Sequence, residues 1–173
     1  ILYTSGTTGK PKGVMLSYDN ILAMYESVCV ECPIITAEER LLVMLPCHHI
    51  LPLLGTIGLP LMIHGSIAYT PSLESADIIE TMGRHGVSIM VGVPLLYDKI
   101  KMGIEAKINA SPVARAIYGL ANTIRSRKFS RIVFKSVHKR FGGKLEYMVS
   151  GGAALDPKTA RFFLNLGFDV LQG

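Results

Sequence analysis

The stretch ILYTSGTTGKPKGVMLS, residues 1–17, joins two short apolar runs through a loop of glycines, hydroxyl side chains and lysines. Glycines within such a loop let the backbone turn tightly and bring its N–H groups close to an anion. The hydroxyl groups add hydrogen-bond donors and the lysines add positive charge, so the stretch predicts a loop that holds phosphate. The residues expected to contact the phosphates are Thr4, Ser5, Gly6, Thr7, Thr8, Gly9 and Lys12.

The path of this loop differs from that of a Walker loop. The Walker pattern, G-x-x-x-x-G-K-[ST], needs four residues between its glycines, whereas two residues separate Gly6 from Gly9. Pro11 stiffens the backbone between Lys10 and Lys12, so we expect Lys12 to point toward the ligand and Lys10 away from it. The apolar residues that follow predict a second strand, and the whole segment therefore predicts a strand–loop–strand hairpin. An ordinary surface turn without a ligand is the alternative.

The rest of the chain alternates apolar, strand-like runs with segments of helical periodicity. Short strands rich in Val, Ile and Leu and separated by helices are typical of a parallel sheet. The predicted fold class is therefore α/β, a doubly wound and mostly parallel sheet with helices on both faces, preceded by the hairpin. The predicted strands are 41–45, 67–70, 87–93, 145–149 and 168–171, and the predicted helices are 19–32, 49–63, 75–85, 95–107, 112–141 and 157–166.

Composition limits the class of protein. The chain has 173 residues, of which 49% are hydrophobic, and this suits one globular unit with a substantial core. The longest apolar run, 50–63, is interrupted by prolines and glycines, so it predicts an irregular buried helix rather than a membrane span. Three cysteines, an odd number, favour reduced thiols and a cytoplasmic setting.

The residues that follow the predicted strands are candidates for a ligand site, because ligands of open parallel sheets bind beyond the carboxyl ends of the strands. Three segments that directly follow predicted strands are the strongest candidates: 46–49, residue 94 and 150–154. In the last of them, Gly151 and Gly152 allow a flat backbone to lie against a planar ring, and the two alanines that follow leave room for it. An ordinary turn from strand to helix explains the same residues equally well.

Three motifs together resemble the adenylate-forming superfamily, which contains AMP-forming acyl-CoA synthetases, luciferases and peptide-synthetase adenylation domains. YTSGTTGKPKG matches the signature TSGTTGxPKG without a gap, SGGAAL matches the segment that packs against adenine, and LPCHH matches the LPxxH motif. The resemblance covers the whole chain and is greatest to fatty acyl-CoA synthetases. It implies that the first loop wraps the β- and γ-phosphates of ATP while a carboxylate attacks the α-phosphate.

The same resemblance assigns roles to further residues. His49 stands three residues after the proline of LPxxH, where the family's side chain lines the channel by which the carboxylate approaches. A histidine there can donate a hydrogen bond to a carboxylate or, when protonated, offset its charge. His49 and Lys12 are therefore the expected catalytic residues, and His48 has no counterpart in the motif. The expected adenine contacts are Gly151, Gly152, Ala153 and Ala154, with Gln172 and Gly173 at the edge of the same pocket.

The activity implied by the resemblance is that of an ATP-dependent, AMP-forming acid–thiol ligase. A fatty acid and ATP would give acyl-adenylate and pyrophosphate, and the acyl group would then pass to CoA. ATP, Mg²⁺ bound with ATP, and CoA are the implied cofactors and substrates, and no metal site of the protein's own is implied. The family's YGxTE segment, its ribose-binding Asp and its C-terminal domain with the catalytic lysine are not found within 1–173. We therefore expect 1–173 to be one partial domain that is inactive on its own.

Positive charge is concentrated in one segment. The segment 107–144 contains ten of the 18 lysines and arginines and no Asp or Glu, in a chain of formal net charge +5. If 112–141 formed one helix, Arg131, Lys135 and Lys139 would recur every four residues and apolar side chains would lie on another side. Such a helix could contact an acidic membrane surface peripherally or the phosphates of CoA, or it could be a solvated surface helix. No nucleic-acid-binding signature accompanies the charge.

Other classes of function remain open from the sequence. The chain could be a phosphate- or membrane-binding module without catalysis, a hydrolase that produces ADP, or an adenylating enzyme for another carboxylic acid. Cys29, Cys32 and Cys47, with a histidine at 48 or 49, superficially resemble a zinc set. The first two fall within a predicted helix, and Cys47 belongs to the LPxxH match, so no metal site is predicted. The sequence does not indicate an oligomeric state.

Overall fold

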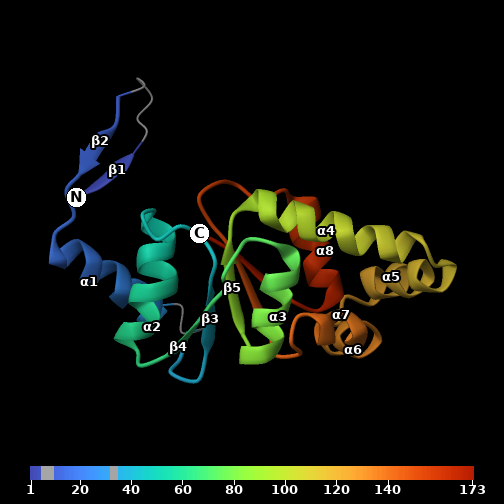
Figure 1. The fold of residues 1–173 in the computed structure, drawn as a ribbon. Coiled ribbons are helices and arrows are strands. Elements are labelled where there is room, and N and C mark those ends of the chain that lie inside the picture. The colour runs from blue at the N-terminus through green and yellow to red at the C-terminus, as the bar shows by residue number, and fades with distance from the viewer. Residues whose placement is uncertain (5–9, 32–34) are drawn as a thin grey trace.

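The N-terminal segment forms the hairpin that the sequence predicts. The computed structural model describes residues 1–4, 10–31 and 35–173. Strand β1 (Leu2–Thr4) pairs antiparallel with β2 (Lys12–Val14), with Thr4 opposite Lys12. The two strands project from the body of the molecule (Figure 1).

A five-stranded parallel sheet forms the centre of the body, in the order β4-β3-β5-β6-β7 (Figure 1). The chain adds β4 on one side of β3, returns to the other side of β3 for β5, and then continues outward to β7. The direction in which strands are added therefore reverses between β3 and β5, which makes this position the topological switch point. The strands are β3 (Arg40–Val43), β4 (Ser66–Tyr69), β5 (Ile89–Gly92), β6 (Tyr147–Ser150) and β7 (Asp169–Gln172).

Helices connect the strands and cover both faces of the sheet, so the predicted doubly wound α/β class is confirmed. Two of the helical segments, η1 and η2, have π-helical backbone. The helical elements are α1 (Tyr18–Glu26), η1 (Ser27–Glu31), η2 (Leu51–Gly58), α2 (Leu59–Met62), α3 (Ser75–His85), α4 (Pro94–Asn109), α5 (Pro112–Ile124), α6 (Arg127–Val133), α7 (Lys135–Arg140) and α8 (Pro157–Leu166).

One face of the sheet carries the main core. Leu42, Met90 and Met148 lie in one row across β3, β5 and β6, and all three are fully buried beneath α3, α4, α5 and α8. The hydroxyl oxygen of Tyr97 on α4 lies 2.9 Å from the carbonyl oxygens of both Met90 and Val149. Burial raises the pKa of Tyr97, so its hydroxyl stays protonated and its one hydrogen is shared between these two carbonyls. This contact holds α4 against two neighbouring strands.

The second face of the sheet carries a smaller hydrophobic cluster. Leu41, Ile89 and Val91 are buried there against Leu51 at the start of η2. Tyr69 of the edge strand β4 points to the same face and is 68% exposed. Within the described residues, the buried side chains of this cluster therefore lie on β3 and β5, the strands that flank the switch point.

The segment predicted as an irregular buried helix forms η2 and, directly after it, α2. Leu59 donates its backbone N–H to the carbonyl of Leu54, a spacing of five residues that marks the π-helical backbone. A Cβ at Gly58 would collide with the buried hydroxyl of Tyr25, so this glycine lets α1 approach η2 closely. Across the described ranges, no helix has the length and apolar character needed to cross a bilayer.

The single helix predicted for 112–141 is wrong, because three helices occupy this segment. Arg125 follows α5 with a φ of 52°, in the left-handed region, and this ends the helix. Ser126 then caps α6 by accepting a hydrogen bond from the backbone N–H of Phe129 at 3.4 Å. A second break falls at Phe134, whose φ of −101° separates α6 from α7.

These breaks also correct the interpretation of the basic segment. Arg131 lies on α6, whereas Lys135 and Lys139 lie on α7, so the three side chains do not form one stripe on one helix. Phe134 and Phe141 are buried in the main core instead of forming the apolar side of a surface helix. The continuous basic amphipathic helix expected from the sequence does not form.

His138 is a buried titratable residue on α7. Its Nε2 lies 2.8 Å from the carbonyl oxygen of Leu166, and its ring centroid lies 4.3 Å from that of Phe168. Because a carbonyl only accepts hydrogen bonds, Nε2 carries the proton and donates. Burial lowers the pKa of His138; the bond to Leu166 opposes this shift, and the charges of Arg131 and Arg127 add to it.

We expect the folded chain to lose stability as the pH falls through the ordinary histidine pKa of 6.5. Because the pKa of His138 is lowered in the folded state, the unfolded chain binds this proton first, and stability therefore rises with pH through this window and is fully present above it. His138→Gln keeps a donor for Leu166 and removes the titration. Urea unfolding at about pH 5.5 and about pH 7.5 should show a smaller difference in this variant than in the wild type.

The matched control is His85→Gln, because His85 is an exposed histidine at the end of α3. This variant should keep the wild-type dependence of unfolding free energy on pH. An equal dependence in His138→Gln and the wild type would contradict the burial of a neutral His138.

Candidate functional site

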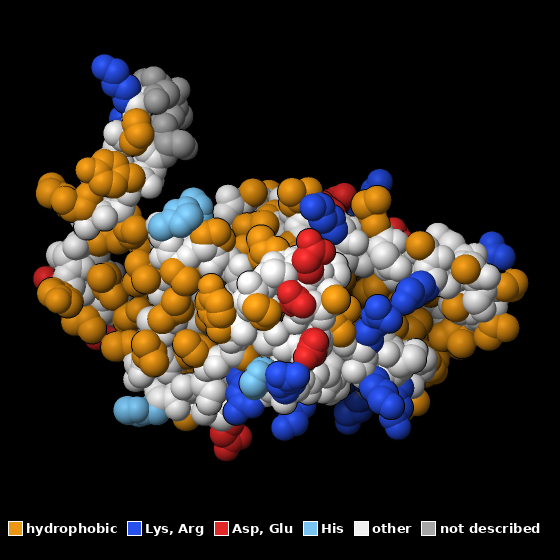
Figure 2. Space-filling view, viewed as in Figure 1, with side chains coloured by type: hydrophobic (Ala, Val, Ile, Leu, Met, Phe, Trp, Pro, Cys, Tyr) orange, Lys and Arg blue, Asp and Glu red, His pale blue; other side chains and the backbone are white. Residues whose placement is uncertain are grey.

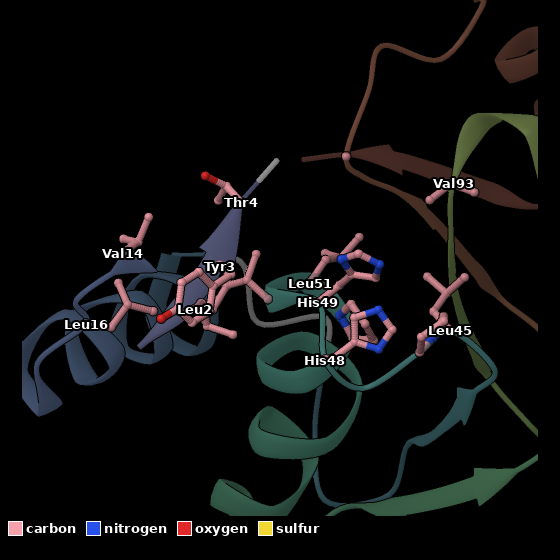
Figure 3. A pocket seen from close by; sticks show the side chains of 14 residues that line it. Leu2, Tyr3, Thr4, Val14, Leu16, Leu45, His48, His49, Leu51 and Val93 are labelled. Carbon is pink, nitrogen blue, oxygen red and sulfur yellow. The ribbon is translucent and has the colours of Figure 1, made fainter. Parts of the chain in front are cut away.

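A cavity of about 680 Å³ opens at the switch point, between the hairpin and the body (Figure 3). One side consists of hairpin residues, and the other consists of the loops after β3, β5 and β6 with the start of η2. The hairpin residues are Leu2, Tyr3, Thr4, Val14 and Leu16, and those of the body are Leu45, Pro46, His48, His49, Ile50, Leu51, Pro52, Val93 and Gly152.

The turn after β3 places two imidazoles at the cavity. The backbone N–H of His49 donates to the carbonyl of Pro46 at 3.2 Å, and the carbonyl of His49 accepts from Leu53 at 3.1 Å as η2 begins. The ring centroids of His48 and His49 lie 4.2 Å apart, and both side chains are exposed. In Figure 3, these rings lie across the cavity from Tyr3 of the hairpin. The cavity therefore has an imidazole edge on the side of the body.

The two positions after β6 require glycine for different structural reasons. Gly151 donates its N–H to the carbonyl of Gly92 at 3.0 Å, and a Cβ at Gly151 would lie 2.8 Å from a methyl carbon of Leu51. Gly152 has a φ of 82°, a left-handed conformation that disfavours any side chain. The first glycine therefore permits close packing on η2, and the second lets the backbone turn at the wall of the cavity.

The end of β7 is tied to the same loop. Gly173 donates its N–H to the carbonyl of Ser150 at 3.0 Å, and the side-chain oxygen of Gln172 accepts from the N–H of Leu155 at 3.4 Å. Gln172 and Gly173 are exposed and flank the loop after β6 without lining the cavity. Their expected place at the edge of an adenine pocket stays a prediction.

The cavity brings together only some of the predicted site residues. Thr4, His49 and Gly152 line it, although they come from three distant parts of the chain. Lys12 lies opposite Thr4 at the start of β2 and is exposed, but it is outside the lining. Gly151 is buried behind the wall, and its neighbours Ala153 and Ala154 are exposed outside the lining. Ser5, Gly6, Thr7, Thr8 and Gly9 lie outside the described residues, so their role in binding phosphate stays a prediction.

Two residues of the lining were assigned no role from the sequence, although one of them, His48, lies within the candidate segment 46–49. His48 lies beside His49 in the cavity although it has no counterpart in the LPxxH motif. Val93 follows β5 and serves as the N-cap of α4. Both residues follow the strands that flank the switch point, and the strand order, which was not predicted from the sequence, is the signal that points to them.

The chemistry of the lining is mainly apolar. The hydroxyls of Tyr3 and Thr4 and the imidazoles of His48 and His49 are its side-chain polar groups, and the described lining includes no Asp or Glu. Among the described residues, no three side chains of His, Cys, Asp or Glu come together in a way that could hold a metal ion. Cys32, a member of the superficial zinc set, lies outside the described part of the chain. The cavity thus suits an apolar group whose polar end meets the imidazoles.

Comparison with known proteins identifies clear relatives. The model of the family described as AMP-binding enzyme matches residues 1–173. Long-chain-fatty-acid–CoA ligase 1 of Schizosaccharomyces pombe is 34% identical over 94% of this chain, and ligase 2 of the same yeast is 31% identical over 99% of it. The chain spans 26% and 27% of these two relatives, about a quarter of their length.

Solved structures agree on the fold. ATP-bound MatB from Rhodopseudomonas palustris matches 99% of this chain with a TM-score of 0.70 and 26% identity, over 27% of its own length. The N-terminal domain of FACL13 from Mycobacterium tuberculosis, solved with an inhibitor, matches 99% of this chain with a TM-score of 0.70 and 20% identity. The match covers 35% of the FACL13 chain, and at this identity it shows the fold alone.

Gly152→Ala should destabilise the chain by about 1–2 kcal/mol, because a Cβ in the left-handed region approaches the following carbonyl oxygen. Gly83→Ala on α3 is the matched control, since a Cβ there would meet no atom within 4 Å and alanine favours a helix. Urea unfolding of both variants measures the difference. If Gly152→Ala were as stable as the wild type, the backbone of this loop would differ from the one described.

Proposed function

Because the chain belongs to the family of AMP-binding enzymes, we propose that it forms the ATP-binding part of an AMP-forming fatty acyl-CoA synthetase. The observation that carries this proposal is the cavity at the switch point, where the strands that bracket the signature loop face His49 and Gly152. In the first step, a carboxylate oxygen attacks the α-phosphorus of ATP, acyl-adenylate forms and pyrophosphate leaves. In the second step, the sulfur of CoA attacks the acyl carbonyl carbon, and AMP leaves.

We place the nucleotide between the hairpin and the loop after β6. Gly152 presents backbone rather than a side chain at the wall of the cavity, which suits contact with a flat ring. The loop between Thr4 and Lys12 would wrap the phosphates, and the ammonium group of Lys12 would offset their charge. Reactions at phosphorus of this kind depend mainly on positioning and on charge stabilisation, which such groups can supply.

The acid substrate is proposed to be a long-chain fatty acid. The apolar side chains of Leu2, Leu16 and Leu51 line the cavity, and an acyl chain would bury its surface against them. The imidazole of His49 at the same cavity can donate a hydrogen bond to the carboxylate. The two yeast relatives are named as ligases of long-chain fatty acids, which supports this choice. An adenylating enzyme for another carboxylic acid is the alternative.

We also propose that Mg²⁺ binds together with ATP and that the protein is cytoplasmic. Mg²⁺ would enter as the ion that accompanies the triphosphate of ATP, and the described lining of the cavity offers it no carboxylate ligand. Cys29 and Cys47 are free thiols, which supports a cytoplasmic setting. Peripheral contact of the basic segment 107–144 with an acidic membrane surface is an additional proposal, supported by its ten lysines and arginines and not by a continuous helix.

The substrate proposal is tested by ATP–pyrophosphate exchange in the full-length enzyme with a panel of acids. We expect exchange with hexadecanoate to exceed exchange with malonate and with phenylalanine, because the cavity wall is apolar. Faster exchange with malonate or phenylalanine would contradict the choice of a fatty acid. Formation of ADP instead of AMP would contradict the ligase reaction itself.

Lys12→Ala should slow ATP–pyrophosphate exchange by about 10²-fold, as expected when one group that stabilises transition-state charge is removed. Lys10→Ala is the matched control, because Lys10 is two residues away, is also exposed and is expected to point away from the ligand. This control should keep an exchange rate close to that of the wild type. Equal rates in Lys12→Ala and the wild type would show that the role of Lys12 is wrong.

A further inference from the structure

A second cavity, of about 660 Å³, shares no lining residue with the first. It is a groove between α3, α4, α5 and the segment of α6 and α7, and its size falls within the range of small-molecule sites. Its wall is formed mainly by aliphatic and aromatic side chains. They include Ile78, Leu96, Ile100, Ile104, Ile117 and Phe134.

Three cations border this apolar groove. Lys99, Lys107 and Arg140 belong to its lining and are exposed, and none of them forms an ion pair with a described residue. No Asp or Glu belongs to the described lining. Figure 2 shows Lys and Arg side chains gathered over the end of the molecule formed by α4 to α7, with hydrophobic side chains between them. The groove therefore combines an apolar wall with a positive rim.

Gly103 keeps part of the groove open. It lies inside α4, where glycine is less favourable than alanine by about 1 kcal/mol. A Cβ at this position would meet no atom within 4 Å, so packing against neighbouring residues does not require the glycine. A larger side chain at Gly103 would instead occupy space at the wall of the groove.

We propose that this groove binds a long-chain carboxylate, with the acyl chain against the apolar wall and the head group at the basic rim to which Lys99, Lys107 and Arg140 belong. The charge of the rim complements an anion, and the wall complements a hydrocarbon chain. A recess between helices encloses a single chain, whereas binding to a bilayer surface uses an amphipathic helix lying flat on it. The continuous basic helix that could act in that way is broken at Arg125 and Phe134.

The groove is a site separate from the one proposed for adenylation. Val93, the N-cap of α4, lines the first cavity, whereas Leu96 and Ile100 on the same helix line the groove. The proposal uses only the shape and charge of the groove, so it does not rest on the proposed ligase activity. Binding can be measured without ATP, and failure of one proposal is distinguishable from failure of the other.

Photo-crosslinking with hexadecanoate that carries a diazirine at the end of its chain locates the site directly. In the full-length protein without ATP, we expect saturable labelling of peptides from α4, α5 and α7. Excess hexadecanoate should compete with the probe, and hexadecanol should not, because it lacks the anionic head group. Labelling confined to the residues of the first cavity would overturn the proposal.

Gly103→Leu tests the groove by filling it. Leucine favours a helix more than glycine does, so this variant should fold, and it should reduce labelling by about tenfold or more. Gly119→Leu on α5 is the matched control, because a Cβ there also meets no atom within 4 Å and Gly119 is outside the lining. It should leave labelling unchanged. Equal labelling of Gly103→Leu and the wild type would refute the site.

The rim is tested by charge reversal. Arg140→Glu should weaken labelling by roughly tenfold, whereas Lys139→Glu, which changes the same charge on the same helix outside the lining, should have little effect. A final arm compares the free probe with the probe diluted into vesicles of phosphatidylserine. Two outcomes would overturn a specific carboxylate site: labelling that occurs only with the vesicles, and labelling that falls equally in Lys139→Glu and Arg140→Glu. Either would indicate a general electrostatic attraction between the basic surface and an anionic membrane.

Discussion

The parallel pairing of β3 with β5 is the interaction on which the rest of the structure depends. Leu41 lies opposite Ile89, and Leu42 lies opposite Met90. All four side chains are fully buried, so the pair is covered on both faces. Because the chain adds β4 on the other side of β3 before it returns to form β5, the loops after β3 and β5 leave in different directions. The cavity that the hairpin completes lies between these loops.

Helix α4 links the two cavities of the molecule. Its N-cap, Val93, lies in the wall of the first cavity, and the helix presents Leu96 and Ile100 to the second. The buried hydroxyl of Tyr97 holds this helix to β5 and β6 through their carbonyl groups. Charge then distinguishes the cavities, since lysine and arginine side chains border the second, whereas exposed histidines line the first.

Much of the fold follows from patterns that are local in the sequence. The hairpin and all five strands of the sheet were predicted with bounds that differ by only a few residues from those observed. The helix at 112–141 was predicted wrongly, because its apolar periodicity runs on past Arg125, where a left-handed residue ends α5. Periodicity reports which side chains can be buried, and it does not report a change of backbone direction between helices that share one core. The same limit explains the failed prediction of a continuous basic helix.

The candidate site was likewise predictable in its local motifs and not in its three-dimensional arrangement. Its motifs, their glycines and the family to which they belong were readable from the sequence, because each motif consists of neighbouring residues with a local physical purpose. Only the tertiary structure decided that Thr4, His49 and Gly152 share one cavity, that His48 lies beside them and that Lys12 lies outside the lining. The apolar groove with its basic rim was likewise decided by folding, since its walls come from helices distant in the chain. The physical reason is that strand order and helix packing depend on contacts between distant residues, whereas strand, turn and loop preferences depend on neighbours.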